Sequence, residues 1–459
     1  MNEQIEEKLT TKHKFTFIDL FAGIGGFHYA LAGLGGKCVM TCEIDAACQH
    51  VYRTAFPTNR LISNIRSITR DSIEDSSTTR TSSAIHLLVP DHDVLCAGFP
   101  CQPFSKSGIQ KGVHDTTRGT LFFDIMEIAR AKHPKYMVLE NVRNLTGPRH
   151  KQTWLTIIDS IRDAGYRVSD DPVVLSPHLI PVAFGGAPQV RDRVFILCEY
   201  IGSGKDKTLT STPLLNRKSF IAWNPDSWNI EDYLIPDSEI KNIENYRLRP
   251  AELAWLEAWE YFVVNIQSDT LPGFPIWVDA FQAKLQIPKS SPQWEQKILT
   301  KNFYFYHSHK EFIDCWLKMK WGSQGITVCD FPKSRQHFEW QARKKHPTAN
   351  GRTLKDLVCQ MRPSGIRVKP ATYLPALVAI TQTSIIGPSI GKIGEYRTIT
   401  PLEAAKLQGI PEGIFAQAGV SDKVAYKQLG NAVNVGVVRL ACSTLMGEAF
   451  RKRSKKSRP

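Results

Sequence analysis

The chain has 459 residues, of which 42% are apolar and 22% charged, a globular composition long enough for two domains with separate cores. Its net charge of +14 and pI of about 9.2 make a polyanion the expected partner, because excess positive charge attracts phosphates. The start lacks an apolar signal segment, and no uncharged apolar run reaches ~18 residues, so we expect neither a signal peptide nor a membrane span.

The ten cysteines are scattered along the chain and form no C-x-x-C pair. This pattern is not that of a structural zinc site or of a small disulfide-rich domain. We therefore expect free thiols in a reducing, cytoplasmic compartment and no bound metal.

From residue 14 to residue 196, apolar stretches alternate with helix-like patterns, which is typical of a doubly wound parallel α/β sheet. A polar stretch, residues 72–83, is predicted to form a loop. The strands are predicted at 15–21, 39–44, 94–97, 137–139, 167–175 and 194–197, and the helices at 27–34, 121–132 and 154–165.

The alternation stops after residue 200, and residues 201–395 are rich in Trp, Tyr, Phe, Lys and Pro without a regular pattern. We expect a second, irregular domain there. Order returns where Thr400 and Glu403 form a capping box, which predicts a helix over 402–408 that stops at Gly409. The last helix is predicted over 434–451.

A glycine-rich turn follows the first predicted strand. Gly23, Gly25 and Gly26 allow close backbone approach to a ligand, and Glu43, 20 residues after Gly23, is placed to bind ribose hydroxyls. A turn that uses glycine only for packing remains an alternative. A nicotinamide dinucleotide would suit the same geometry, so these residues alone leave the cofactor open.

Cys101 lies in the loop that follows the strand predicted at 94–97, at the carboxyl edge where α/β sheets form their sites. A lone cysteine is usually a small buried apolar residue. Here the neighbours are glycine, two prolines and the polar Gln102 and Ser105, which are poor core material. This setting favours a functional thiol.

Glu140 ends the next predicted strand and brings a carboxylate to the same edge of the sheet. Arg191 and Arg193 are two residues apart, so in extended backbone they share a face. A helix cap or salt bridge for Glu140, and a solvated strand edge for the arginines, are alternatives of equal weight for each residue taken alone.

Six motifs in this order resemble the DNA (cytosine-5) methyltransferase family, of the prokaryotic modification type, over nearly the whole chain except its middle. They are FIDLFAGIGG (17–26), GFPCQPFS (98–105), ENV (140–142), QVRDR (189–193), RTITP through LQGIP (397–411) and QLGNAV (428–433).

The resemblance implies a Rossmann-like, S-adenosylmethionine-dependent methyltransferase domain, a second target-recognition domain, and a DNA cleft between them. The domains implied are a catalytic and cofactor-binding part (1–200), a target-recognition part (201–395), a hinge (396–423), and a C-terminal helix returning to the catalytic domain (424–459).

It also implies roles for individual residues. Cys101 would be the nucleophile, Glu140 would hydrogen-bond the cytosine ring, Arg193 would hold oxygen 2, and Arg191 would support the loop or a phosphate. Asn64 stands where the family often has an aspartate, although its amide can still accept a hydrogen bond from adenine. The residues implied to hold S-adenosylmethionine are Phe21, Gly23, Gly25, Glu43, Asn64, Leu121, Asn431 and Val433.

The partner implied is double-stranded DNA, whose target cytosine must be flipped out at a cost of a few kcal/mol. The middle segment resembles members that modify GGNCC or GGWCC sites. We expect a monomeric enzyme, with a restriction endonuclease of the same specificity as its genetic partner. The candidate DNA contacts are Gln102, Ser105, Arg362, Arg367, Gln382 and Thr383, and the two arginines would contact guanine or phosphate.

Three other functions are weighed against this one. A tRNA cytosine-5 methyltransferase shares the chemistry, but a minimal enzyme of that kind would not need the large middle domain. A nicotinamide-dependent oxidoreductase would leave Cys101, Glu140 and Arg193 unexplained. A non-catalytic DNA-binding protein would not need the cofactor turn.

Overall fold

The computed structural model describes residues 13–72, 79–100, 121–202, 229–268, 271–342, 352–377 and 383–455. The chain divides into two compact units, each described here by itself. Unit 1 comprises residues 1–227 and 405–459, and unit 2 comprises residues 228–404. Unit 2 thus extends past residue 395, because its sheet includes the strand β16 (Arg397–Thr398).

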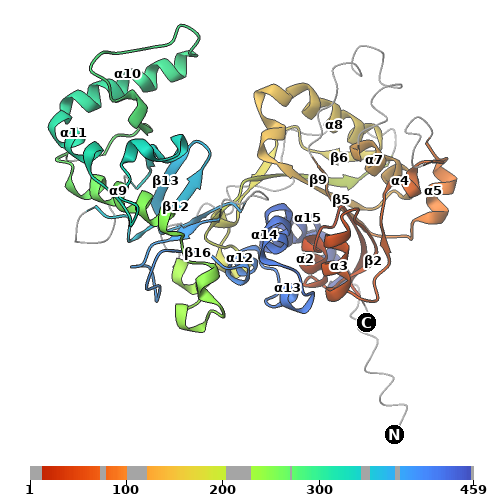
Figure 1. The fold of residues 1–459 in the computed structure, drawn as a ribbon. Helices are drawn as coiled ribbons and strands as arrows, with labels where there is room; N and C mark the ends of the chain where they lie inside the picture. Colours follow the sequence, from red (N-terminus) through yellow and green to blue (C-terminus); the bar gives the residue numbers. More distant parts are fainter. Residues whose placement is uncertain are drawn as a thin grey trace. The chain divides into compact units, whose positions relative to one another are not determined.

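Unit 1 is built on a central sheet whose strands follow the order β3-β2-β1-β4-β5-β9-β6, with β7 also paired to β9 (Figure 1). The reversal of strand order around β1 is typical of doubly wound folds. The strands are β1 (Phe15–Leu20), β2 (Gly36–Cys42), β3 (Leu61–Ile62), β4 (Val94–Gly98), β5 (Tyr136–Val142), β6 (Tyr166–Val168), β7 (Val173–Leu175) and β9 (Arg193–Tyr200), with the short β8 (Gln189–Val190) before β9.

The sheet is mixed, whereas the sequence pattern predicted a parallel one. Strands β3, β2, β1, β4 and β5 are parallel to their neighbours, but β9 runs antiparallel to β5, β6 and β7. The single strand predicted at 167–175 is two strands, β6 and β7. A turn interrupts it, in which Ser169 Oγ accepts a hydrogen bond from the Asp171 N–H (3.1 Å) ahead of Pro172.

Helices cover both faces of this sheet (Figure 1). One face packs against α4, α5, α7 and α8 through a single apolar core, and α2 and α15 cover the other face. The helices of unit 1 are α2 (Gly26–Ala32), α3 (Ala46–Ala55), α4 (Arg66–Thr69), α5 (Ser82–Leu88), α7 (Leu121–Lys132), α8 (Lys151–Asp163), α13 (Ile414–Gln417), α14 (Asp422–Asn431) and α15 (Val435–Lys455).

One helical stretch of the described chain, Asp422–Gly447, combines length with a mean hydropathy of 1.2 in its 18-residue window. By length and composition it is able to cross a membrane. However, 72% of that window is buried, and α15 packs along α2. These are the properties of a core helix.

Unit 2 contains its own sheet, in the order β10-β11-β13-β12-β15-β16, where the sequence shows no regular alternation of elements. Among the neighbouring strands described in this sheet, β11 and β13 are parallel and the other pairs are antiparallel. The elements are β10 (Ile276–Trp277), β11 (His337–Trp340), β12 (Leu357–Arg362), β13 (Gly365–Pro370), β15 (Ile385–Ile386) and β16, the short β14 (Leu374–Pro375), and the helices α9 (Pro250–Asn265), α10 (Gln293–Ser308) and α11 (Lys310–Lys318).

Aromatic side chains form the core of unit 2. Trp259 stacks on Phe338, with ring centroids 4.6 Å apart, and contacts Trp316 at 5.0 Å. The indole N–H groups of both tryptophans donate to backbone carbonyls, those of Arg335 and Ala258 (2.9 Å each). The aromatic richness of this region therefore supplies a packed core.

The helix α12 (Pro401–Gln408) begins with the predicted capping box: Thr400 N–H donates to Glu403 (2.7 Å), and Glu403 N–H donates to Thr400 Oγ1 (3.2 Å). The helix ends before Gly409, which has φ +70°. Fully buried Arg397 binds both oxygens of Glu403 and also Asp237 (2.8 Å). This network joins the start of α12 to Asp237, which precedes the strands of the unit 2 sheet in the sequence.

Candidate active site

The glycine turn between β1 and α2 has backbone conformations that L-residues rarely adopt. Phe21 has φ +59°, Gly23 φ +57° and Gly25 φ +91°. A Cβ on Gly25 would lie 2.7 Å from the Phe56 ring, and one on Gly26 would lie 2.6 Å from Val433 Cγ2. Glycine at 25 and 26 is therefore required by the close packing of α2.

Glu43 follows β2 and is buried, with 8% of its surface exposed. One carboxylate oxygen accepts from the Gly23 N–H and the other from the Asp45 N–H, both at 2.7 Å. Each oxygen keeps a lone pair for a further donor. The next residue, Ile44, has 70% of its surface exposed, although it is apolar.

This arrangement fits a nucleoside cofactor: a fixed carboxylate for ribose hydroxyls lies between a tight glycine turn and an exposed apolar side chain. Ile44 was not among the predicted residues. Its place as an apolar residue directly after the acid predicted to bind ribose was a signal in the sequence that could have indicated it. No group of three His, Cys, Asp or Glu residues suited to a metal occurs in the part of the chain that the structure describes.

Asn64 and Leu121 lie at the starts of two helices that Asp124 links. Asn64 follows β3, the neighbour of β2, and its Oδ1 accepts from the Arg66 N–H (3.0 Å), at the start of α4. Leu121 opens α7, and fully buried Asp124, one turn on, accepts from Thr69 and Arg70. This contact fixes α4 against α7.

Arg191 holds the carboxyl end of α14. This buried arginine donates to the carbonyls of Gly430 (2.8 Å) and Ala432 (2.7 Å), and burial lowers its pKa to about 9. Asn431 between them is exposed. Val433 is buried against the glycine turn and near Gly98, at the end of β4.

Glu140 and Arg193 form an ion pair across adjacent strands. Glu140 lies on β5 and is mostly buried, and its Oε1 is 3.0 Å from Arg193 Nε at the start of β9. The Arg193 side chain keeps 21% of its surface exposed. Burial raises the pKa of the Glu140 carboxyl, and the charges of Arg193 and Arg191 oppose this shift.

The end of β4 lies beside Glu140, because Gly98 is its register partner. Buried Asn141 donates from Nδ2 to the carbonyl of Phe99 (3.0 Å), and so holds the chain just before Cys101. The site predictions omitted Asn141, although it follows Glu140 in a recognised motif. Its role depends on a contact between residues 42 positions apart.

Four predicted site residues lie outside the described residues: Cys101, Gln102, Ser105 and Gln382. In unit 2, Arg367 forms an ion pair with Glu339 (2.7 Å), and Arg362 ends β12 opposite Gly365. Thr383 precedes β15 and is half-buried.

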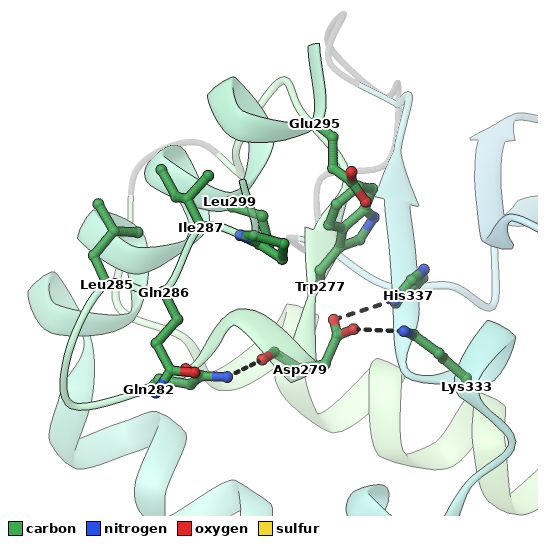
Figure 2. A pocket seen from close by; sticks show the side chains of 11 residues that line it. Trp277, Asp279, Gln282, Leu285, Gln286, Ile287, Glu295, Leu299, Lys333 and His337 are labelled. Carbon is green, nitrogen blue, oxygen red and sulfur yellow. Dashed lines mark hydrogen bonds and ion pairs between the residues drawn. The ribbon is translucent and has the colours of Figure 1, made fainter. Parts of the chain in front are cut away.

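Unit 2 also contains a cavity of about 670 Å³ between α10 and the strands β10 and β11. Figure 2 shows Asp279 bonded to His337 and Lys333 on one side, with Leu285 and Ile287 on the other. The carboxylate of Asp279 is thus already paired with two basic groups.

Comparison with known proteins identifies the family to which the chain belongs. A family model described as C-5 cytosine-specific DNA methylase matches residues 15–445. The chain belongs to this family of C-5 cytosine-specific DNA methylases. It is a DNA (cytosine-5) methyltransferase of the prokaryotic modification type. An oxidoreductase and a non-catalytic DNA-binding protein are thereby excluded.

The relatives include bacterial modification enzymes. The chain is 37% identical to Type II methyltransferase M.AluI of Cellulosimicrobium cellulans, over 93% of this chain and 91% of that protein. It is 38% identical to Type II methyltransferase M.HpaII of Haemophilus parainfluenzae, over 46% of this chain and 52% of that one. The crystal structure of S. pombe Dnmt2 methyltransferase shares the fold, with a TM-score of 0.52 and 17% identity over 95% of this chain and 99% of that one.

Proposed function

We propose that the enzyme transfers the methyl group of S-adenosylmethionine to carbon 5 of a flipped cytosine through a covalent adduct with Cys101. The observation that carries this proposal is the Glu140–Arg193 pair, which lies beside Gly98 three residues before Cys101. The pair supplies a carboxyl group and a guanidinium at one sheet edge, and the reaction requires both of these groups together with a thiol.

Eight residues are proposed to hold the cofactor. The Glu43 carboxylate would bind the ribose hydroxyls, Asn64 the adenine, and the glycine turn the remainder of the molecule. When bound, the cofactor supplies an electrophilic methyl group. Phe21, Gly23, Gly25, Leu121, Asn431 and Val433 complete the proposed site.

Carbon 5 of cytosine is too weak a nucleophile to accept a methyl group unaided. We propose that the Cys101 thiolate adds to carbon 6, which turns the ring into an enamine with a nucleophilic carbon 5. After methylation a base removes the proton from carbon 5, and the carbon–sulfur bond breaks to release Cys101 as thiolate. Positive charge nearby would lower the thiol pKa and favour the thiolate.

Glu140 is proposed to donate a hydrogen bond to ring nitrogen 3 as negative charge develops there. Its raised pKa supports this role, because burial favours the protonated carboxyl. Arg193 would hold oxygen 2 and keep Glu140 in place. Arg191 is proposed to support the loop or a phosphate, and its contacts with two carbonyls at the end of α14 favour a supporting role.

DNA is proposed to bind in a cleft between unit 1 and unit 2, with unit 2 reading the bases in the major groove. Gln102 and Ser105 would contact the DNA from the catalytic loop. The proposed base or phosphate contacts of unit 2 are Arg362, Arg367, Gln382 and Thr383. A monomeric enzyme in the cytoplasm, paired genetically with a restriction endonuclease, completes the proposal.

Methyl transfer from labelled S-adenosylmethionine tests this function, with duplex DNA and tRNA as alternative acceptors. We expect labelled duplex DNA, unlabelled tRNA, and no product from Cys101→Ser. Cys315→Ser, at an exposed cysteine of unit 2, is the matched control and should be fully active. Transfer to tRNA alone would contradict the proposal. Bisulfite sequencing of DNA from expressing cells then identifies the modified sequence.

A further inference from the structure

Helix α10 of unit 2 presents two aromatic and two basic side chains to solvent on one face: Trp294, Lys297, Lys301 and Tyr304, here called the α10 stripe. At 3.6 residues per turn they fall within an arc of roughly 80° and extend over about 15 Å. Trp294 is 60% exposed and Tyr304 63%, and both lysines are exposed. They form a continuous patch.

Contacts with residues 274–277 hold the helix and two of the stripe's own side chains in place. Fully buried Asn302 accepts from the Trp277 N–H and donates to the Pro275 carbonyl (2.9 Å each). The Trp294 ring meets the Trp277 ring edge to face, with centroids 6.4 Å apart. Lys301 Nζ lies 5.6 Å above the Phe274 ring. The stripe is therefore built on a fixed helix.

The charge of the stripe is positive. The one acidic residue of α10, Glu295, lines the cavity with Trp277 on another side of the helix (Figure 2). Within the described ranges, no carboxylate lies within ion-pair distance of Lys297 or Lys301. Tyrosine hydroxyl and indole N–H groups also donate to phosphate oxygens. The patch is therefore complementary to a polyanion.

We propose that the α10 stripe binds the phosphodiester backbone of the duplex substrate and contributes affinity without sequence preference. This inference rests on the DNA methyltransferase function. Lysine contacts with phosphates release counterions, so each contact steepens the salt dependence of binding. The stripe would thus add to whatever contacts read the recognition sequence.

The test measures binding of the full-length enzyme to labelled duplexes, with and without the modified sequence, by fluorescence anisotropy at several salt concentrations. S-adenosylhomocysteine is present throughout. Lys297→Ala/Lys301→Ala should weaken binding to both duplexes by about tenfold and lower the salt slope by about 2, with kcat at saturating DNA unchanged. Trp294→Ala/Tyr304→Ala should weaken binding to the two duplexes by the same factor. Lys318→Ala/Lys320→Ala, at exposed lysines outside the stripe, is the matched control.

Unchanged affinity and salt slope in the lysine variant would overturn the proposal, as would an equal loss in the control. Loss of binding to the modified sequence alone would assign base reading to the stripe instead. A wild-type dimer that Trp294→Ala/Tyr304→Ala dissociates, with DNA binding intact, would show that a second copy of the chain occupies it. A wild-type enzyme that binds duplex DNA without methylating it would contradict the proposed function and leave this test valid.

Discussion

At the scale of single residues, the ion pair between Glu140 and Arg193 is at the centre of the proposed site. A mostly buried carboxylate gains little net stability from such a pair, because desolvation offsets the attraction. The Arg193 side chain also remains partly exposed, so the pair is open on one side. This opening is what the proposed contact of Arg193 with the cytosine requires.

The pH dependence of the rate follows from this pair. Burial raises the pKa of Glu140, so the donating, protonated form should be lost as pH rises through that value, and the rate should fall. Arg193→Ala removes a charge that lowers this pKa. We expect the falling limb of the pH profile to move to higher pH, with a loss of about 100-fold in kcat.

Single-turnover rates as a function of pH measure this shift. Arg143→Ala, which breaks the exposed pair with Asp192, is the control and should leave the limb in place. If the falling limb of the pH profile stays at the same pH in Arg193→Ala, a group other than Glu140 is responsible for it.

Glu43 gives the second prediction at this scale. Glu43→Ala should weaken S-adenosylmethionine binding by about 1 to 3 kcal/mol, because hydrogen bonds to a charged group are lost. Glu43→Gln keeps one acceptor oxygen and should lose less. Calorimetry measures both, with circular dichroism to confirm folding. Wild-type affinity in a folded Glu43→Ala would remove Glu43 from the cofactor site.

Among the elements, the glycine turn shows a difference that the sequence alone does not reveal. Gly23 and Gly25 both have positive φ, but a Cβ would meet nothing within 4 Å at Gly23 and the Phe56 ring at 2.7 Å at Gly25. A side chain at either position would be strained by the positive φ, but only a side chain at position 25 would also clash with a neighbouring ring. That difference depends on how α3 packs beside the turn.

Gly23→Ala should lower the free energy of unfolding by about 1 kcal/mol, and Gly25→Ala by about 3 kcal/mol. Urea unfolding measures both values. Phe56→Leu in the Gly25→Ala background should recover part of the additional loss, because it removes the contacted ring. Equal losses in the two alanine variants would contradict the steric argument.

Strands β1, β2, β4, β5 and β9 were predictable to within a few residues, but β3 and the division of 167–175 into β6 and β7 were not, and neither were the strand directions. Buried parallel and antiparallel strands have the same apolar pattern, so β9 could not be distinguished from a parallel strand. That Glu140 and Arg193 lie at one edge of the sheet could be predicted, because both lie in motifs at strand ends. The partners of Arg191 could not, because they lie 239 and 241 residues away in sequence.

At the scale of the whole molecule, the chain leaves unit 1 after residue 227 and returns after residue 404. A boundary at 395 would separate Arg397 and Glu403 from Asp237, which together form one buried network. The sequence could not indicate this boundary, because short strands such as β16 carry no periodic pattern of their own. Segment exchange should therefore use residues 228–404.

Exchange of residues 228–404 with the matching segment of a relative of different specificity should transfer the sequence preference and keep the chemistry. Bisulfite sequencing of DNA modified by the hybrid measures the preference. A hybrid cut at 201 and 395 serves as the control and should be less stable, because it breaks the Arg397 network. An active hybrid that kept its original preference would place base reading in unit 1.

The covalent adduct with Cys101 is the central claim, and DNA carrying 5-fluorocytosine at the target tests it most directly. Fluorine at carbon 5 cannot leave as a proton does, so elimination stops and the enzyme stays bound. With S-adenosylmethionine present, we expect a complex that survives denaturing electrophoresis and maps to Cys101. Cys101→Ser should form none, because a hydroxyl is a far weaker nucleophile near neutral pH, and Cys315→Ser should form it normally. An active wild type that yields no adduct, or a Cys101→Ser variant that traps DNA equally well, would contradict the mechanism.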